Sequence, residues 1–146
     1  MLQEVTEGID PDEIVGLGIA NQRETTVLWD RATGQPVHKA IVWQDVRAGA
    51  IAAQLEPKKE RITYLTGLVP SAYYSAAKAA HVLREDPSLM VCAENGEICF
   101  GTVDSYLLYR LTGGKSFATD LTNASRTQLL DIHTCCFSEE LANDFG

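Results

Sequence analysis

The sequence of 146 residues predicts an α/β domain, in which strands and helices alternate along the chain. Two observations predict this class. Residues 14–20 and 24–43 contain β-rich apolar runs separated by turn residues, and most of the remaining chain carries helical patterns that end at glycine or proline. The length is that of one domain, and no repeat or linker divides it.

The first expected strand is residues 14–20, IVGLGIA. A short apolar run without alternation is typical of a strand buried on both faces, so we expect it in an interior, parallel part of a sheet. A second run, residues 24–30, is followed by the turn residues RATGQP and a third run, residues 37–43. Two β-rich runs around a glycine-containing loop predict a β-hairpin.

Three helices are expected after the hairpin, at residues 46–55, 58–65 and 75–84. Each is followed by a residue that ends helices, namely Pro57, Gly67 and Pro87. Residues 67–74 carry no periodic pattern and contain a proline, so we expect a loop between the second and third helices.

The second half begins with an expected strand at residues 98–100, a break at Gly101 and a helix N-cap at Thr102. The following helix ends at Gly113-Gly114. Its expected apolar face consists of Val103, Leu107 and Leu111. An extended segment and a last helix are expected at residues 125–130 and 138–143.

Composition excludes several kinds of partner. A formal net charge of −8 and the absence of a run of basic residues argue against nucleic acid and against an anionic membrane. The four cysteines have no C-x-x-C spacing, which predicts free thiols and no zinc site. The first residues are acidic and no apolar run reaches membrane-spanning length, so we expect a cytoplasmic protein. Neither a P-loop nor a dinucleotide-binding glycine motif occurs.

Arg23 and Glu24 form the pair that most favours a binding site. Neighbours in a regular strand point to opposite faces, so the two side chains converge only if the strand has already ended in a turn. The carboxyl end of a strand is where open α/β sheets bind ligands. Arginine donors, a carboxylate acceptor and an apolar wall suit a small neutral polyol, and Trp43 with Tyr73 or Tyr74 would supply that wall. The alternative is a surface ion pair worth roughly 0–1 kcal/mol.

Several segments together resemble the FGGY carbohydrate kinase family, in particular its glycerol-phosphorylating members. These segments are GIANQRETTVLWDRATGQPV, AIVWQDVR, TGLVPSAYYSAAK, FGTVDSYLLYRLTGG and TDLTNASRTQLLDIHT. The resemblance implies a partial actin/hexokinase-like (ribonuclease H-like) domain with an inserted β-hairpin and helices. Residues 1–146 would be part of the N-terminal, substrate-binding domain, with residues 1–10 as the tail of a helix, and the nucleotide-binding C-terminal domain would lie outside the chain.

The resemblance also implies a set of site residues. Arg23 and Glu24 would hydrogen-bond the hydroxyls of glycerol or a similar small polyol, Trp43 would pack on its carbon edge, and Tyr73 would add a hydroxyl contact. The family's acidic-proline element is replaced here by Pro70-Ser71-Ala72, which leaves Tyr74 as an alternative to Tyr73.

Catalysis would need groups outside this chain. The resemblance implies ATP and Mg²⁺ in the complete enzyme, neither of which we expect this chain to bind fully, and no catalytic base within it. Three carboxylates near the matched segments are interpreted as structural, namely Asp45, Asp104 and Asp120. Another FGGY sugar or polyol kinase, or a non-catalytic polyol-binding or subunit-interaction module, is the alternative function. A homo-oligomer is also expected as a possible state.

Overall fold

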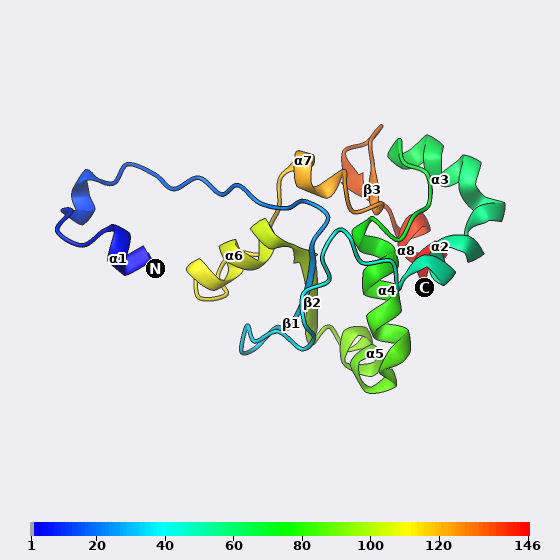
Figure 1. Ribbon diagram of the computed structural model, residues 1–146, viewed down its shortest axis with the longest axis horizontal. Coiled ribbons are helices and arrows are strands. Elements are labelled where there is room, and N and C mark those ends of the chain that lie inside the picture. The colour runs from blue at the N-terminus through cyan, green and yellow to red at the C-terminus, as the bar shows by residue number, and fades with distance from the viewer. Residues whose placement is uncertain (1) are drawn as a thin grey trace.

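The computed structural model describes residues 2–146, with side chains from residue 4 onward. Figure 1 shows helices packed around a short sheet, and an N-terminal arm, residues 2–20, that runs away from this body. The elements in chain order are α1 Leu2–Val5, the 3-10 turn η1 Pro11–Glu13, β1 Thr26–Asp30, α2 Gly49–Gln54, the 3-10 turn η2 Glu56–Lys58, α3 Lys59–Thr66, α4 Ser75–Glu85, α5 Pro87–Glu94, β2 Ile98–Thr102, α6 Val103–Leu111, α7 Leu121–Ala124, β3 Leu130–Asp131, β4 Cys136–Phe137 and α8 Glu139–Phe145.

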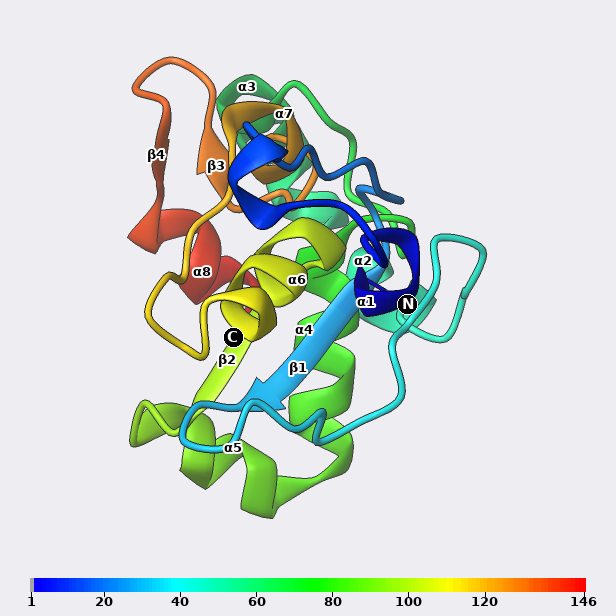
Figure 2. The same cartoon turned by 90° about the vertical axis from the view of Figure 1, so that its left-hand side faces the viewer.

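The central sheet pairs β1 with β2 in antiparallel register, from Thr26 opposite Thr102 to Asp30 opposite Ile98. Successive side chains of β1 face opposite sides. Leu28 packs toward Val82 of α4, whereas Trp29 packs against the rings of α6. The two helices therefore cover the two faces of the sheet, as Figure 2 shows.

The expected hairpin forms only in part. Residues 37–43 contain no named strand, and the chain touches the free edge of β1 through two isolated bridges, Thr26 with Ile41 and Trp29 with Pro36. At the first bridge each backbone N–H donates to the partner carbonyl at 2.9 Å. At the second bridge the flanking residues make the hydrogen bonds: the Val37 N–H donates to the Leu28 carbonyl at 3.0 Å and the Asp30 N–H donates to the Gln35 carbonyl at 2.9 Å, so Pro36 needs no N–H there.

The expected buried strand at residues 14–20 is wrong. Among the described residues this segment has no strand partner, and it runs along the N-terminal arm with Val15 fully exposed and Leu17 59% exposed. A strand needs a neighbour for its N–H and C=O groups, and both edges of β1 are already occupied by β2 and by residues 36–41. Both described sheets are antiparallel, so the expected parallel part is not found within residues 2–146.

Helix α4 lies at the centre of the main apolar core. It packs against α2, α5 and α8 as well as both strands of the central sheet. The buried residues of this core are Ala48, Ile51, Leu55, Ile62, Leu65, Ala76, Ala77, Ala80, Leu141 and Phe145. The expected helices after the hairpin are confirmed as α2, α3 and α4, and Gly67 ends α3 in the left-handed conformation with φ +72°.

Helix α4 stops at Glu85, before Pro87, as expected. The sequence interpretation missed α5, in which Pro87 is the first residue and Asp86 caps the helix by accepting from the Ser88 and Leu89 backbone N–H groups. One local signal near β2 was misinterpreted. Gly101 is not a break but lies inside β2. A Cβ at Gly101 would lie 2.8 Å from Cβ of Ser105, so the glycine allows α6 to approach the strand closely.

Helix α6 buries a different face from the one expected. Leu107 and Leu111 are 38% and 46% exposed, whereas Tyr109 is buried with its ring 5.6 Å from that of Trp29. Aromatic packing against Trp29 thus determines the orientation of the helix. Thr102 is the N-cap residue, as expected, but its side chain makes no capping hydrogen bond.

The expected extended segment at residues 125–130 is largely a turn. It follows α7, a short helix that the sequence interpretation missed, and Gln128 adopts φ +63° before β3 begins at Leu130. The last helix is confirmed as α8, with the Ser138 hydroxyl capping the Leu141 N–H. All four cysteines are free, as predicted. Within residues 2–146, no helix has the length and apolarity needed to cross a membrane.

Candidate functional site

Arg23, Glu24, Trp43 and Tyr73 line one open pocket of about 220 Å³, together with Asn21 and Gln22. Residues 22–25 form a turn, in which the Thr25 N–H donates to the Gln22 carbonyl at 3.1 Å, and this turn leads directly into β1. The Arg23-Glu24 pair therefore lies outside regular strand structure, where both side chains reach the same pocket.

Glu24 is nearly buried, with 8% of its surface exposed. Its Oε1 accepts a hydrogen bond from Nε of Arg126 at 2.7 Å, which pairs the two charges. No hydrogen bond to the second carboxylate oxygen, Oε2, is found from any side chain or backbone group that the structure describes. That oxygen is an acceptor that a ligand hydroxyl can use.

Arg23 is exposed, and its Nη1 lies 3.5 Å from the carbonyl oxygen of Thr122 at the start of α7. Its neighbour Asn21 is fixed more firmly, because Nδ2 donates to the side-chain oxygens of Asp104 at 3.2 Å and Asn123 at 3.1 Å. The segment before β1 is thus attached to α6 and α7, while the arginine guanidinium remains accessible to a ligand.

The aromatic wall consists of Trp43 and Tyr73. Their ring centroids are 6.1 Å apart in an edge-on arrangement, and Trp43 is 42% exposed. Tyr74 contacts Tyr73 edge-on at 5.2 Å but is not among the residues that line the pocket. Instead, the Arg126 guanidinium lies 5.1 Å above the Tyr74 ring. Geometry therefore favours Tyr73 over Tyr74 as the pocket tyrosine.

Two cations behind the pocket were not found by sequence reasoning. Arg126 pairs with Glu24, and the fully buried Lys78 donates from Nζ to the backbone carbonyls of Glu24 at 2.6 Å and Tyr73 at 2.7 Å. Burial lowers the pKa of Lys78 to about 8, although Glu24 and Asp45 act in the opposite direction. The sequence did carry a signal for Lys78: it lies four residues before Val82, on the apolar face of an alanine-rich helix, where a lysine is unusual.

The three carboxylates interpreted as structural all have local partners. Asp45 pairs with the guanidinium of Arg47, and hydrogen bonds from Arg47 lower the pKa of Asp45 to about 2. Asp104 accepts from Asn21 and from the hydroxyls of Thr102 and Thr119. Asp120 caps α7, where the hydrogen bonds from Thr122 and Asn123 lower its pKa to about 2.

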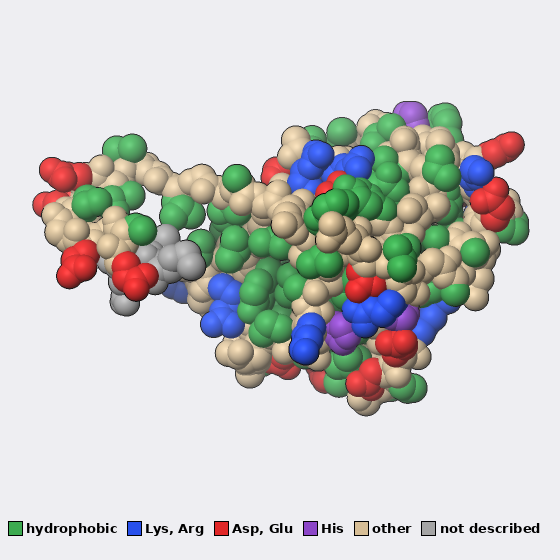
Figure 3. Space-filling view, viewed as in Figure 1, with side chains coloured by type: hydrophobic (Ala, Val, Ile, Leu, Met, Phe, Trp, Pro, Cys, Tyr) green, Lys and Arg blue, Asp and Glu red, His purple; other side chains and the backbone are tan. Residues whose placement is uncertain are grey.

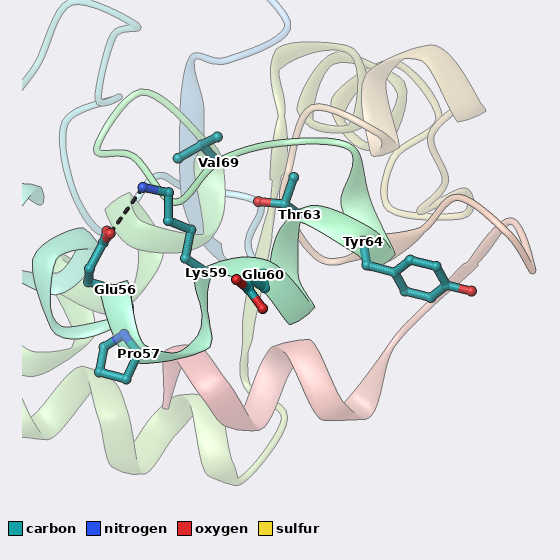
Figure 4. A pocket seen from close by; sticks show the side chains of 7 residues that line it. All are labelled: Glu56, Pro57, Lys59, Glu60, Thr63, Tyr64 and Val69. Carbon is teal, nitrogen blue, oxygen red and sulfur yellow. Dashed lines mark hydrogen bonds and ion pairs between the residues drawn. The ribbon is translucent and has the colours of Figure 1, made fainter.

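A larger hollow of about 930 Å³ lies beside α3, as Figure 4 shows. Its charged lining residues are Glu56, Lys59 and Glu60, and Lys59 already pairs with Glu56 at 3.0 Å. The one cation that lines this hollow among the described residues is therefore paired, unlike the accessible guanidinium of Arg23. No group of three or more His, Cys, Asp or Glu side chains that could hold a metal ion occurs among the described residues.

The fold has a β1–β2 sheet covered by helices on both faces, and a small polar pocket lies where the chain enters β1. Comparison with known proteins assigns this arrangement to a family. Residues 1–146 match the N-terminal domain of the FGGY family of carbohydrate kinases, and the chain belongs to this family.

Within this family, the chain is similar to proteins named glycerol kinase. Glycerol kinase from Xanthobacter autotrophicus is 51% identical over 141 residues, which cover 95% of this chain and 28% of that protein. Glycerol kinase from Nitrobacter hamburgensis is 54% identical over 136 residues, covering 92% of this chain and 27% of that protein. The chain thus spans little more than a quarter of the length of these relatives.

Solved structures agree with the family assignment. Plasmodium falciparum glycerol kinase with ADP superposes with a TM-score of 0.84 at 37% identity, over 88% of this chain and 26% of that one. Gluconate kinase from Lactobacillus acidophilus superposes with a TM-score of 0.79 at 20% identity, over 99% of this chain and 28% of that one, which speaks to the fold alone. The predicted class, a partial actin/hexokinase-like domain, is confirmed by these neighbours.

Proposed function

We propose that this chain is the substrate-binding portion of an ATP-dependent glycerol kinase, which transfers the γ-phosphate of ATP to a terminal hydroxyl of glycerol. The observation that carries the proposal is that Arg23, Glu24, Trp43 and Tyr73 line a single pocket. Its volume, about 220 Å³, is below the roughly 300–1,000 Å³ typical of sites for drug-sized ligands, which suits a three-carbon polyol.

Each wall of the pocket has a chemical role toward glycerol. Arg23 donates to hydroxyl oxygens, and Oε2 of Glu24 accepts from hydroxyl hydrogens. Trp43 covers the C–H edge and limits water on that side. Tyr73 adds a hydroxyl that both donates and accepts.

Nucleotide binding is proposed for the complete enzyme and not for residues 1–146 alone. Among the described residues there is no cluster of three or more His, Cys, Asp or Glu side chains that could hold a metal ion, and the sequence has no phosphate-binding glycine loop. We place ATP, Mg²⁺ and the catalytic base in the remaining length that the relatives have, and residues 1–146 in the substrate domain. A cytoplasmic location and a homo-oligomeric state are parts of the same proposal.

The test is a segment exchange. This chain replaces the matching segment of the Xanthobacter autotrophicus glycerol kinase, and ATP-dependent phosphorylation of glycerol, erythritol, xylulose and gluconate is measured. Glycerol is expected to give the highest kcat/KM, and Arg23→Ala to lower it by about tenfold or more through loss of charge-assisted donors. Arg61→Ala is the matched control, because Arg61 pairs with Glu140 away from the pocket.

Two outcomes would redirect the proposal. A higher kcat/KM for xylulose or gluconate than for glycerol would show that the chain comes from a kinase of another sugar. Calorimetric binding of glycerol without phosphorylation of any substrate would favour a non-catalytic polyol-binding module.

A further inference from the structure

Lys78 is the feature behind the pocket that the proposed function does not explain. It is fully buried in α4, and lysine is almost never fully buried unless its ammonium group is satisfied. The only hydrogen bonds of its Nζ within the described part of the chain go to two main-chain carbonyls, those of Glu24 at 2.6 Å and Tyr73 at 2.7 Å. Nζ also lies 5.8 Å from the centroid of the Tyr73 ring.

The two carbonyls belong to two different segments of the chain, each of which forms one wall of the same pocket. Glu24 lies in the turn before β1, and Tyr73 lies at the end of the loop between α3 and α4. The two residues are 49 positions apart in sequence, and Lys78 is 54 positions from Glu24. One ammonium group therefore connects two segments that local backbone hydrogen bonding does not connect.

We propose that Lys78 is a positioning residue for the pocket, whose ammonium group holds the Glu24 wall and the Tyr73 wall at a fixed spacing. It does not touch the polyol. The relevance to glycerol rests on the proposed function, whereas the effect on the two walls does not. Hydrogen bonds from a charged donor are stronger than those between neutral groups, which suits this role.

The first test needs no ligand. Lys78→Met keeps the length of the side chain but removes both donors, and Lys115→Met, at an exposed lysine, is the matched control. Amide hydrogen exchange at residues 22–25 and 71–75 is expected to accelerate by about tenfold or more in Lys78→Met, with exchange in α8 unchanged. Acrylamide quenching should also increase, and it reports on Trp43, because Trp29 is fully buried.

A second variant covers the case in which Lys78→Met does not fold cooperatively. Lys78→Gln retains an amide donor on a shorter side chain, so its exchange rates at the same residues should lie between those of the parent and Lys78→Met. If both variants show parental exchange and quenching, Lys78 does not set the spacing of the walls and the proposal is wrong.

The second test uses glycerol. In the segment-exchange kinase, Lys78→Met is expected to raise KM for glycerol about tenfold while kcat changes much less, because ground-state binding is what the walls provide. Parental KM together with faster exchange would overturn the role in substrate binding. If the parent itself does not bind glycerol but Lys78→Met still loosens both walls, the proposed function fails and the positioning role survives.

Discussion

Glu24 joins the pocket to the interior through two different groups. Its carboxylate accepts from Arg126, and its carbonyl accepts from Lys78. Only 8% of Glu24 is exposed, so its carboxylate has lost most of its hydration, and the hydrogen bond from Arg126 compensates for that loss. At the scale of single residues, the position of Glu24 in the pocket therefore depends on two cations that do not line it.

Removal of Arg126 should destabilise the protein. Arg126→Met leaves the Glu24 carboxylate nearly buried and unpaired, so the free energy of unfolding in urea at pH 7 is expected to fall by about 1–3 kcal/mol. Arg61→Met is the control, because Arg61 and Glu140 form an exposed pair worth less than about 1 kcal/mol. Equal losses in the two variants would contradict a stronger pair at Glu24.

The two adjacent tyrosines should behave differently. Tyr73→Phe removes a hydroxyl from a residue that lines the pocket, and we expect the Kd for glycerol to rise by about three- to tenfold. Tyr74→Phe keeps the ring on which the Arg126 guanidinium lies, so glycerol affinity should be unchanged. Calorimetry measures both, and the opposite order would assign the site to Tyr74.

Lys78 should also make stability depend on alkaline pH. Burial lowers the pKa of Lys78 in the folded protein to about 8 from its ordinary value of 10.5, and the charges of Glu24 and Asp45 oppose this shift. Between these two pH values the unfolded chain holds a proton that the folded chain has lost, so stability rises with pH. The difference in unfolding free energy between parent and Lys78→Met should therefore grow in favour of the parent from pH 8 to 10.5. A flat or falling difference would show that the pKa is not lowered.

At the scale of elements, sequence signals worked where the cause is local. Gly67 ends α3 and Ser138 caps α8 because these residues act on their own helix ends. Sequence signals failed where contacts with distant residues determine the structure. Trp29 determines which face of α6 is buried. The contacts of Lys78 and Arg126 with Glu24 span 54 and 102 residues. The pocket residues were nameable in advance, whereas the cations that hold Glu24 depend on tertiary structure.

The C-terminus of α3 provides a test of local backbone conformation. Gly67 has φ +72°, which a residue with a Cβ adopts only with strain, so Gly67→Ala should lower the unfolding free energy by about 1–2 kcal/mol. Gly49→Ala, in α2, is the control, because its φ is not positive and no atom lies within 4 Å of the added Cβ. That substitution should be neutral or stabilising by less than about 1 kcal/mol in the same urea titration. Similar effects at both positions would exclude a conformational cause.

At the scale of the whole molecule, the arm is the part that packs least. Figure 3 shows hydrophobic and acidic side chains along it, away from the body. The exposed large hydrophobic residues of the arm are Val5, Ile9, Ile14, Val15, Leu17 and Ile19. Residues 14–20 of the arm form an extended apolar segment that pairs with no strand among the described residues, and such a segment is a site for association between chains.

Self-association through the arm is therefore expected for the 146-residue chain. Sedimentation velocity should show an average mass that rises with concentration, and Val15→Lys should reduce this rise by placing a charge on the extended segment. Val46→Lys is the control, because Val46 is 78% exposed but lies outside the arm. An equal reduction by Val46→Lys would place the contact elsewhere.

The acceptors of the Lys78 ammonium group are main-chain carbonyls, which every residue type carries. Exchange of the side chain at Tyr73 therefore leaves both acceptors in place, whereas exchange at Glu24 also removes the hydrogen bond from Arg126. The side chains that line the pocket can thus change while Lys78 keeps the spacing of the two backbone segments unchanged. Under the proposed function, Tyr73 and Trp43 are the positions at which protein engineering would select a different polyol preference, with Lys78 kept constant.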